Sequence, residues 1–241
     1  MRIPSGLITA SLLALMSSPA VMAAEEEKSA WSGSAELGSI RTSGNTSTSS
    51  TSGKFDLKHA GEHWDSRLRL TSLNSKDDGE TSKEKYTAGV QFDRNFSATT
   101  YLAITADQER DRFSGFEYQS TAGFGFGYRA INRDTMHLDL EAGPGYRRDK
   151  IDGSGDIQEE AIGRLALKYH WTINDAVKFF EEFTADMGSE NSIYRSETGL
   201  QSRLNGSLAM NLSYKIKYVD EVPLGSEQKD TEFGVTLVYS F

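Results

Sequence analysis

The residues best suited to chemistry in this sequence are charged side chains that recur at every second position. His137, Asp139 and Glu141 form one such run, and Asp107 with Glu109 forms another. Residues two apart lie on the same face of an extended strand, so each run gathers its side chains on one surface. An imidazole with carboxylates is compatible with a metal site, and two carboxylates with an acid pair for hydrolysis. Mutual ion pairing explains the same residues, and we favour that interpretation.

Serine-based catalysis on lipids has little support in the sequence. Such a site needs a serine, a histidine and an orienting group close together. Of the four histidines, only His137 and His170 lie in the interior of predicted strands, and both occupy the charged parity, whereas His59 and His63 flank a tight turn. A nucleophile that acts on lipids is expected on the opposite, apolar parity. The chain has no cysteine, so thiolate metal sites are not available. We therefore expect no catalytic residues, no metal and no cofactor. The alternative is an enzyme that is embedded in a β-barrel and modifies lipids or peptides.

The elements that position these charges are strands. In Thr231–Phe241 the apolar residues fall at every second position, and mostly small or polar residues lie between them. A period of two indicates a strand with one apolar face. The alternation begins at Trp31 and continues without a sustained helical period, which predicts an all-β fold. The predicted strands are 31–41, 46–59, 63–74, 83–96, 101–112, 115–130, 134–149, 157–173, 176–188, 192–204, 206–219 and 229–241.

The second face of these strands carries charges in mid-strand. In a sandwich or a lipocalin-type barrel, apolar faces point into a core and polar faces meet water. In a membrane barrel the arrangement is reversed, with the charges toward a polar lumen. Alternation alone does not distinguish the two. The candidate lumen charges are Asp65, Arg67, Arg69, Asp107, Glu109, Asp139, Glu141, Arg164, Lys168, Arg195, Glu197 and Arg203.

Connection lengths and aromatic positions favour the membrane barrel. Odd-numbered connections are long and polar, as in NSKDDGETSKEK, whereas even-numbered ones are tight, as in IND. Such alternation is typical of outer-membrane barrels, in which aromatic belts also mark both membrane interfaces. The sequence therefore predicts a transmembrane up-and-down antiparallel β-barrel of about twelve strands. The aromatics expected at the interface on the short-turn side are Trp31, Trp64, Tyr128, Trp171 and Phe241.

Glu181 departs from the pattern. It lies on the apolar parity between Phe179 and Phe183, where a lipid-facing charge costs on the order of 1–4 kcal/mol. Either a bulge shifts the parity there, or the residue lies near the membrane interface. We favour the interface, because the IND turn is close. Arg94, between two phenylalanines, is expected at the same level.

The first residues predict export. Arg2 precedes an apolar stretch and a small-residue site ending at Ala23, which is the pattern of a cleaved secretory signal peptide. The formal charge of −9 becomes −10 once Arg2 is removed, which argues against nucleic-acid binding. The expected organisation is a signal peptide at 1–23, a short acidic leader at 24–30 and an outer-membrane barrel at 31–241.

Several short elements carry a family resemblance. They are Gly127-Tyr128-Arg129, Leu138-Asp139-Leu140-Glu141, Gly143-Pro144-Gly145-Tyr146-Arg147, the early GNTST and the terminal DTEFGVTLVYSF. With these elements the chain resembles the YdiY-like family of salt-induced outer-membrane proteins with a domain of unknown function. The resemblance implies a barrel in the outer membrane of a Gram-negative envelope. It implies no activity, so no catalytic residue is carried over.

These observations predict a non-enzymatic outer-membrane barrel with a charged lumen. We expect a narrow or closed pore that stabilises the envelope or admits small solutes poorly, with salt stress as the setting that the resemblance implies. The expected partners are outer-membrane lipid and the insertion machinery during assembly, without nucleic acid, and the expected state is a monomer. A soluble periplasmic ligand-binding barrel is the other alternative, and it would turn the apolar parity inward.

Overall fold

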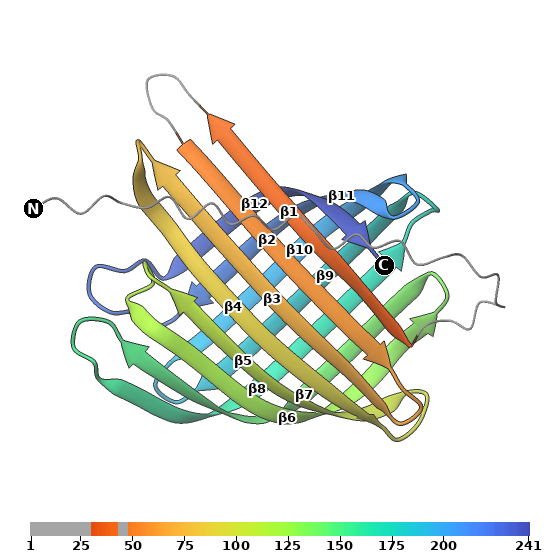
Figure 1. Ribbon diagram of the computed structural model, residues 1–241. Helices are drawn as coiled ribbons and strands as arrows, with labels where there is room; N and C mark the ends of the chain where they lie inside the picture. Colours follow the sequence, from red (N-terminus) through yellow and green to blue (C-terminus); the bar gives the residue numbers. More distant parts are fainter. Residues whose placement is uncertain (1–29, 43–47) are drawn as a thin grey trace, which may run out of the picture.

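The computed structural model describes residues 30–42 and 48–241, so the expected signal peptide and most of the leader lie outside the described residues. Within them, twelve antiparallel strands close into one barrel in chain order, with β12 beside β1 (Figure 1). The predicted all-β barrel is confirmed, and each predicted strand has a counterpart. The strands are β1 (Trp31–Thr42), β2 (Thr48–Ala60), β3 (Trp64–Asp77), β4 (Glu80–Asn95), β5 (Thr100–Asp111), β6 (Phe116–Arg133), β7 (Met136–Ile151), β8 (Ile157–Thr172), β9 (Val177–Gly188), β10 (Ser192–Asn205), β11 (Leu208–Val219) and β12 (Lys229–Ser240).

The two ends of the barrel differ in their connections. The end where β1 begins and β12 ends is called the turn end here, and its connections are 61–63, 96–99, 134–135, 173–176 and 206–207. The opposite end is called the loop end. Its described connections are 78–79, 112–115, 152–156, 189–191 and 220–228.

The contrast between the ends is smaller than the sequence suggests, because strands extend into several segments expected as loops. In NSKDDGETSKEK, β3 continues to Asp77 and β4 begins at Glu80. Asp78 and Gly79 form the whole turn, with φ of 49° and 88°. Positive φ at both central residues gives the backbone twist that a two-residue hairpin needs, and Asp-Gly is a sequence that supplies it. The segment is therefore a long hairpin.

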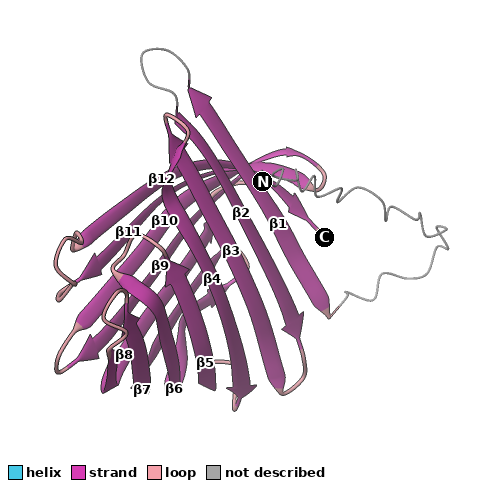
Figure 2. Ribbon diagram, turned by 60° about the vertical axis from the view of Figure 1, so that its left-hand side comes forward, coloured by secondary structure: helices cyan, strands magenta, loops and turns pink. Residues whose placement is uncertain are grey.

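The barrel closes through a short seam. Ser34–Leu37 of β1 pair with Leu237–Ser240 of β12, and Gly33 exchanges backbone hydrogen bonds of 2.8 and 3.0 Å with Phe241. On its other side, β1 pairs with β2 along its whole length. The loop-end half of β1 stands apart from β12 in both ribbon views (Figures 1 and 2). The closure is therefore carried by the turn-end halves of these two strands.

The two faces of the wall follow the two parities of the sequence. The outer face exposes large apolar side chains, such as Leu37 and Phe124 at 72% and 59%. No helix among the described residues is long and apolar enough to cross a membrane. The interior is polar, which excludes the alternative of a soluble barrel with an apolar lumen. The largest fully buried side chains are Arg147, Tyr101, Ile193, Val238, Asp149 and Asp186.

Glycines of β6 and β7 leave room in the inner wall for a large side chain and for close approach of the neighbouring strand. A Cβ on Gly127 would overlap the ring of Tyr101, which is 2% exposed. A Cβ on Gly143 would meet the backbone carbonyl of Phe124 on the adjacent strand. The Gly-x-Gly repeats therefore serve close packing of the wall, as expected for small residues opposite large ones.

Candidate functional site: the charged lumen

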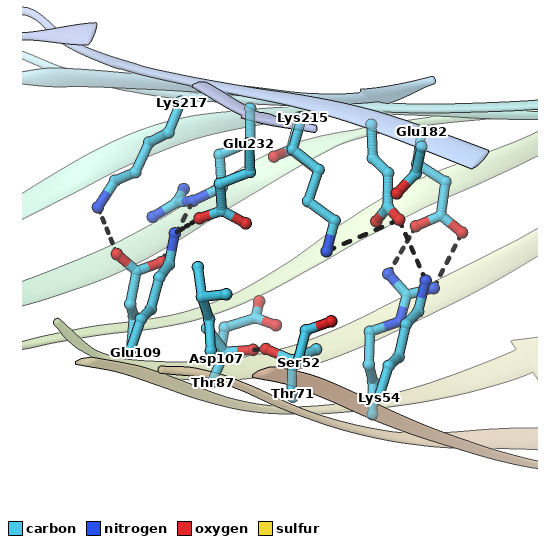
Figure 3. Close-up of a pocket in the computed structure, with 18 of the residues that line it drawn as sticks. Ser52, Lys54, Thr71, Thr87, Asp107, Glu109, Glu182, Lys215, Lys217 and Glu232 are labelled. Atoms are coloured by element: carbon cyan, nitrogen blue, oxygen red, sulfur yellow. Dashed lines mark hydrogen bonds and ion pairs between the residues drawn. The ribbon is translucent and has the colours of Figure 1, made fainter. Parts of the chain in front are cut away.

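Ion pairs between opposite walls cross the lumen. Arg69 of β3 binds Glu182 of β9 with Nη1–Oε2 at 2.6 Å, and it also contacts Asp56 Oδ2 of β2 at 3.1 Å. Arg67 binds Asp56 at 2.6 Å and lies 3.4 Å from Glu182. Strands β3 and β9 are six places apart in the twelve-strand order, so this pairing joins facing sides of the barrel. Figure 3 shows Glu182 reaching from the upper wall toward this cluster.

A second bridge lies toward the loop end. Lys217 of β11 donates to Glu109 of β5 and to Gln119 Oε1, the latter at 2.7 Å. Lys217 and Glu109 are both almost fully buried, and β5 and β11 are again six strands apart. Lys85 of β4 binds Glu232 of β12 at 3.3 Å, and Glu232 lies beside Lys217 and Glu109 (Figure 3). The lumen is therefore crossed at two levels.

Further pairs fill the wall between and beside the bridges. Arg164 binds Asp107 at 3.0 Å and Asp186 at 3.2 Å, and Arg195 binds the other oxygen of Asp186 at 3.1 Å. Glu197 lies 3.3 Å from Lys54 and 3.8 Å from Lys215 of β11. Each of these three carboxylates thus has at least one cationic neighbour, which offsets the cost of burying its charge.

Lys168 forms a separate polar group nearer the turn end. Its Nζ donates to Glu141 Oε1 at 2.8 Å and to Gln91 Oε1 at 2.7 Å. The hydroxyl of Tyr101 donates to the same Glu141 oxygen at 2.8 Å. Arg129 lies over the Tyr101 ring with its guanidinium carbon 4.7 Å from the centroid. These contacts fix the side chains and make them a rigid part of the wall.

The bridges leave a cavity of about 360 Å³ inside the lumen. Hydroxyls of Ser52, Thr71 and Thr87 line one side, and Thr71 and Thr87 share a hydrogen bond of 2.5 Å. Lys215 extends into the same region from β11 (Figure 3). Charged and hydroxyl-bearing side chains line much of this space, which is of a size for water, ions or a small solute.

A second cavity of about 540 Å³ lies at the turn end, where it is lined by Asp65, His137 and Asp139 among others. Asp65 accepts from Asn95 at 2.9 Å and lies 3.5 Å from Arg129. Among the described residues, no group of three or more histidine, aspartate or glutamate side chains is arranged to hold a metal. Within the run of His137, Asp139 and Glu141, the first two line this cavity, whereas Glu141 belongs to the Lys168 group.

The candidate lumen charges occupy the inner face, with different surroundings. Arg203 lies exposed at the turn end of β10, where its backbone N–H donates to Ala176. Asp65 and Asp139 line the turn-end cavity. The rest take part in the lumen contacts, namely Arg67, Arg69, Asp107, Glu109, Glu141, Arg164, Lys168, Arg195 and Glu197.

Several lumen residues were not among the sequence candidates. Asp56, Glu182 and Asp186 supply carboxylates to the bridges, and Lys217 supplies a cation. All four share parity with candidate positions or with neighbouring charges, so a complete list by parity would have included them. Their partners follow from the stagger of the closed barrel, which the sequence does not display.

The five predicted interface aromatics lie on the outer face at the turn end and are exposed by 39% to 56%. Phe241 stacks on Phe55 and Tyr239, with ring centroids 6.4 and 6.2 Å apart. Arg94 lies over the Trp64 ring at 5.5 Å, also at this end. The aromatic set is Trp31, Trp64, Tyr128, Trp171 and Phe241.

An apolar outer face, a polar lumen and a closed twelve-stranded wall together define a membrane β-barrel. The chain belongs to a family described as "Protein of unknown function, DUF481", whose model matches residues 35–241. A relative in Escherichia coli (strain K12), the uncharacterized protein YdiY, is 26% identical over 231 residues. That match covers 95% of this chain and 89% of the relative. The predicted family resemblance is confirmed.

A solved outer-membrane channel shows the same kind of fold. An outer membrane channel from Pseudomonas putida F1, described as COG4313, has a TM-score of 0.51 at 10% identity, covering 88% of this chain and 96% of that chain. The NanC porin has a TM-score of 0.49 at 10% identity, covering 86% and 97%. At these identities the likeness concerns the fold.

Proposed function

We propose that this protein is a non-enzymatic outer-membrane barrel whose lumen is a narrow, nearly closed channel for ions and small polar solutes. One observation carries the proposal, namely the ion pairs that join opposite walls at Arg69–Glu182 and Glu109–Lys217. An eight-stranded barrel is filled by side chains and a sixteen-stranded porin leaves an aqueous channel. A twelve-stranded barrel lies between these sizes, so a few bridging side chains determine whether its bore is open.

The chemistry of the lumen supports passage of small polar species over catalysis. Its charges are engaged with one another, and the two acids considered for hydrolysis point to different partners, since Asp107 binds Arg164 and Glu109 binds Lys217. An acid pair that shares a proton needs two carboxylates in contact. The proposal includes a monomer surrounded by outer-membrane lipid and inserted by the assembly machinery. An association with salt stress rests on the family resemblance alone.

Current through a planar bilayer tests the channel. The double variant R69S/E182S removes both partners of one bridge, so it leaves no unpaired charge at that contact. We expect a small current from the unaltered barrel and a several-fold larger current from the variant. The control is R148S, because Arg148 is half-exposed and paired with Glu159. Equal currents from the unaltered barrel and R69S/E182S would show that this bridge does not restrict the bore.

A further inference from the structure

The outer face of β9 carries a carboxylate that the lumen does not use. Glu181 lies opposite Tyr169 of β8 and Thr198 of β10, and neither register shifts along β9. Glu181 therefore keeps the outward parity of Phe179 and Phe183, and the alternative of a bulge is excluded. It lies one pleat from Phe179, which is paired with the exposed Trp171 at the turn end. Glu181 thus faces the membrane close to the aromatic belt.

Two hydroxyls from β10 hold this carboxylate. Ser196 Oγ donates to Oε1 at 2.7 Å, and Thr198 Oγ1 donates to Oε2. Both hydroxyls also lie on the outer face, so the three side chains form one polar spot on an otherwise apolar surface. Among the described residues, none of the ion pairs includes Glu181, whereas the lumen carboxylates of Glu109, Glu182, Asp186 and Glu197 each have a cationic partner. The carboxylate is oriented by neutral donors, and its charge is not balanced by the protein.

The surroundings define the chemistry of a partner. A carboxylate has about four lone-pair positions, and the two hydroxyls occupy two of them, so it can accept further hydrogen bonds from a donor on the membrane side. The rings of Tyr169 and Phe179 lie beside it with centroids 6.1 Å apart, and aromatic rings attract cations. A carboxylate together with aromatic rings suits an ammonium group. A calcium ion needs six to eight oxygen ligands, and a single carboxylate does not provide them.

We propose that Glu181, with Ser196, Thr198 and Tyr169, binds the primary ammonium of a lipid headgroup of the phosphatidylethanolamine type. The inference rests on the proposed membrane location, because the occupant comes from the bilayer. Aromatic belts mark the headgroup level, and Glu181 lies next to one, so a headgroup ammonium is within reach of the carboxylate. A primary ammonium supplies N–H donors to the free lone pairs as well as a positive charge.

Native mass spectrometry of the barrel in detergent tests this site. Phosphatidylethanolamine or phosphatidylcholine with the same acyl chains is added, and the retained lipid is counted. We expect the unaltered barrel to retain phosphatidylethanolamine about tenfold better, as one charge-assisted hydrogen bond allows. Glu181→Gln should remove this preference. Glu159→Gln should keep it, because Glu159 is an exposed carboxylate already paired with Arg148 at 3.2 Å.

A second measurement needs only the unaltered barrel. Lipids whose headgroup amine carries one, two or three methyl groups offer progressively fewer N–H donors, so retention should fall along the series. Equal retention across the series, or the same preference in Glu181→Gln, would overturn the inference. A gel shift on boiling shows separately that each sample is a folded barrel. A folded barrel without lipid preference refutes the lipid site alone, whereas a chain recovered without detergent refutes the proposed function.

Discussion

Tyr101 shows how one buried residue can contact several strands inside this barrel. Its ring fills the space above Gly127, its hydroxyl donates to Glu141, and Arg129 covers its face. Because these contacts come from three sides, the ring has no free direction in which to move. Only glycine leaves room for this ring at position 127, because any Cβ there would overlap it.

Gly127→Ala should therefore destabilise the barrel by about 1–3 kcal/mol, the usual cost of overpacking. The matched control is Gly234→Ala, because a Cβ at Gly234 would have only an ordinary contact of 3.4 Å with Ser213 Oγ. The measurement is the urea midpoint of folded barrel in vesicles. Equal midpoints for the two variants would contradict the role assigned to Gly127.

At the scale of the elements, strand positions follow from the sequence and the pairing of charges does not. The segment predicted at 134–149 is found as Met136–Ile151, because the alternation persists through it. The sequence predicts a long loop around Asp78-Gly79, because the residues on both sides are polar, yet Asp-Gly is a hairpin sequence and the structure has a two-residue turn there. The alternation of apolar and charged residues predicts that the side chain of Arg69 faces the lumen. Its partner Glu182 lies 113 residues away and is set by the stagger of the strands.

The last strand offers a test of parity. Phe241 stacks outward on Phe55 and Tyr239, and its backbone pairs with Gly33 in the seam. Phe241→Asp should lower the yield of assembled barrel, because it places a charge where an aromatic anchor lies. Ser240→Asp should be tolerated, since Ser240 has the lumen-facing parity. The readout is the amount of heat-shifting protein in outer-membrane fractions at matched expression. Equal losses would show that parity does not matter at this end.

As a whole molecule, the protein inverts the usual order of a soluble domain, with charges inside and apolar side chains outside. Most of the charges inside are paired across and along the wall, which offsets the cost of burying them. The outside remains stable only against lipid or detergent, because large apolar side chains are exposed on most of the strands.

The purified chain should therefore be recovered only with detergent, and it should change mobility on a gel when boiled. A closed ladder leaves no strand edge for detergent to attack, so it should stay folded until heated. The comparison is between boiled and unboiled samples of the same preparation. Recovery in an aqueous extract, or identical mobility, would contradict a membrane barrel.

The short seam has a consequence for the kinetics of assembly. Every other neighbouring pair joins strands that are consecutive in the chain, and hairpins of this kind form within microseconds. Only the pairing of Ser34–Leu37 with Leu237–Ser240 must wait until the last strand has arrived. Until then β1 and β12 are open edges, able to pair with other chains. We therefore expect closure to be the slow step, and pulse proteolysis during refolding should detect the open sheet before the closed barrel appears.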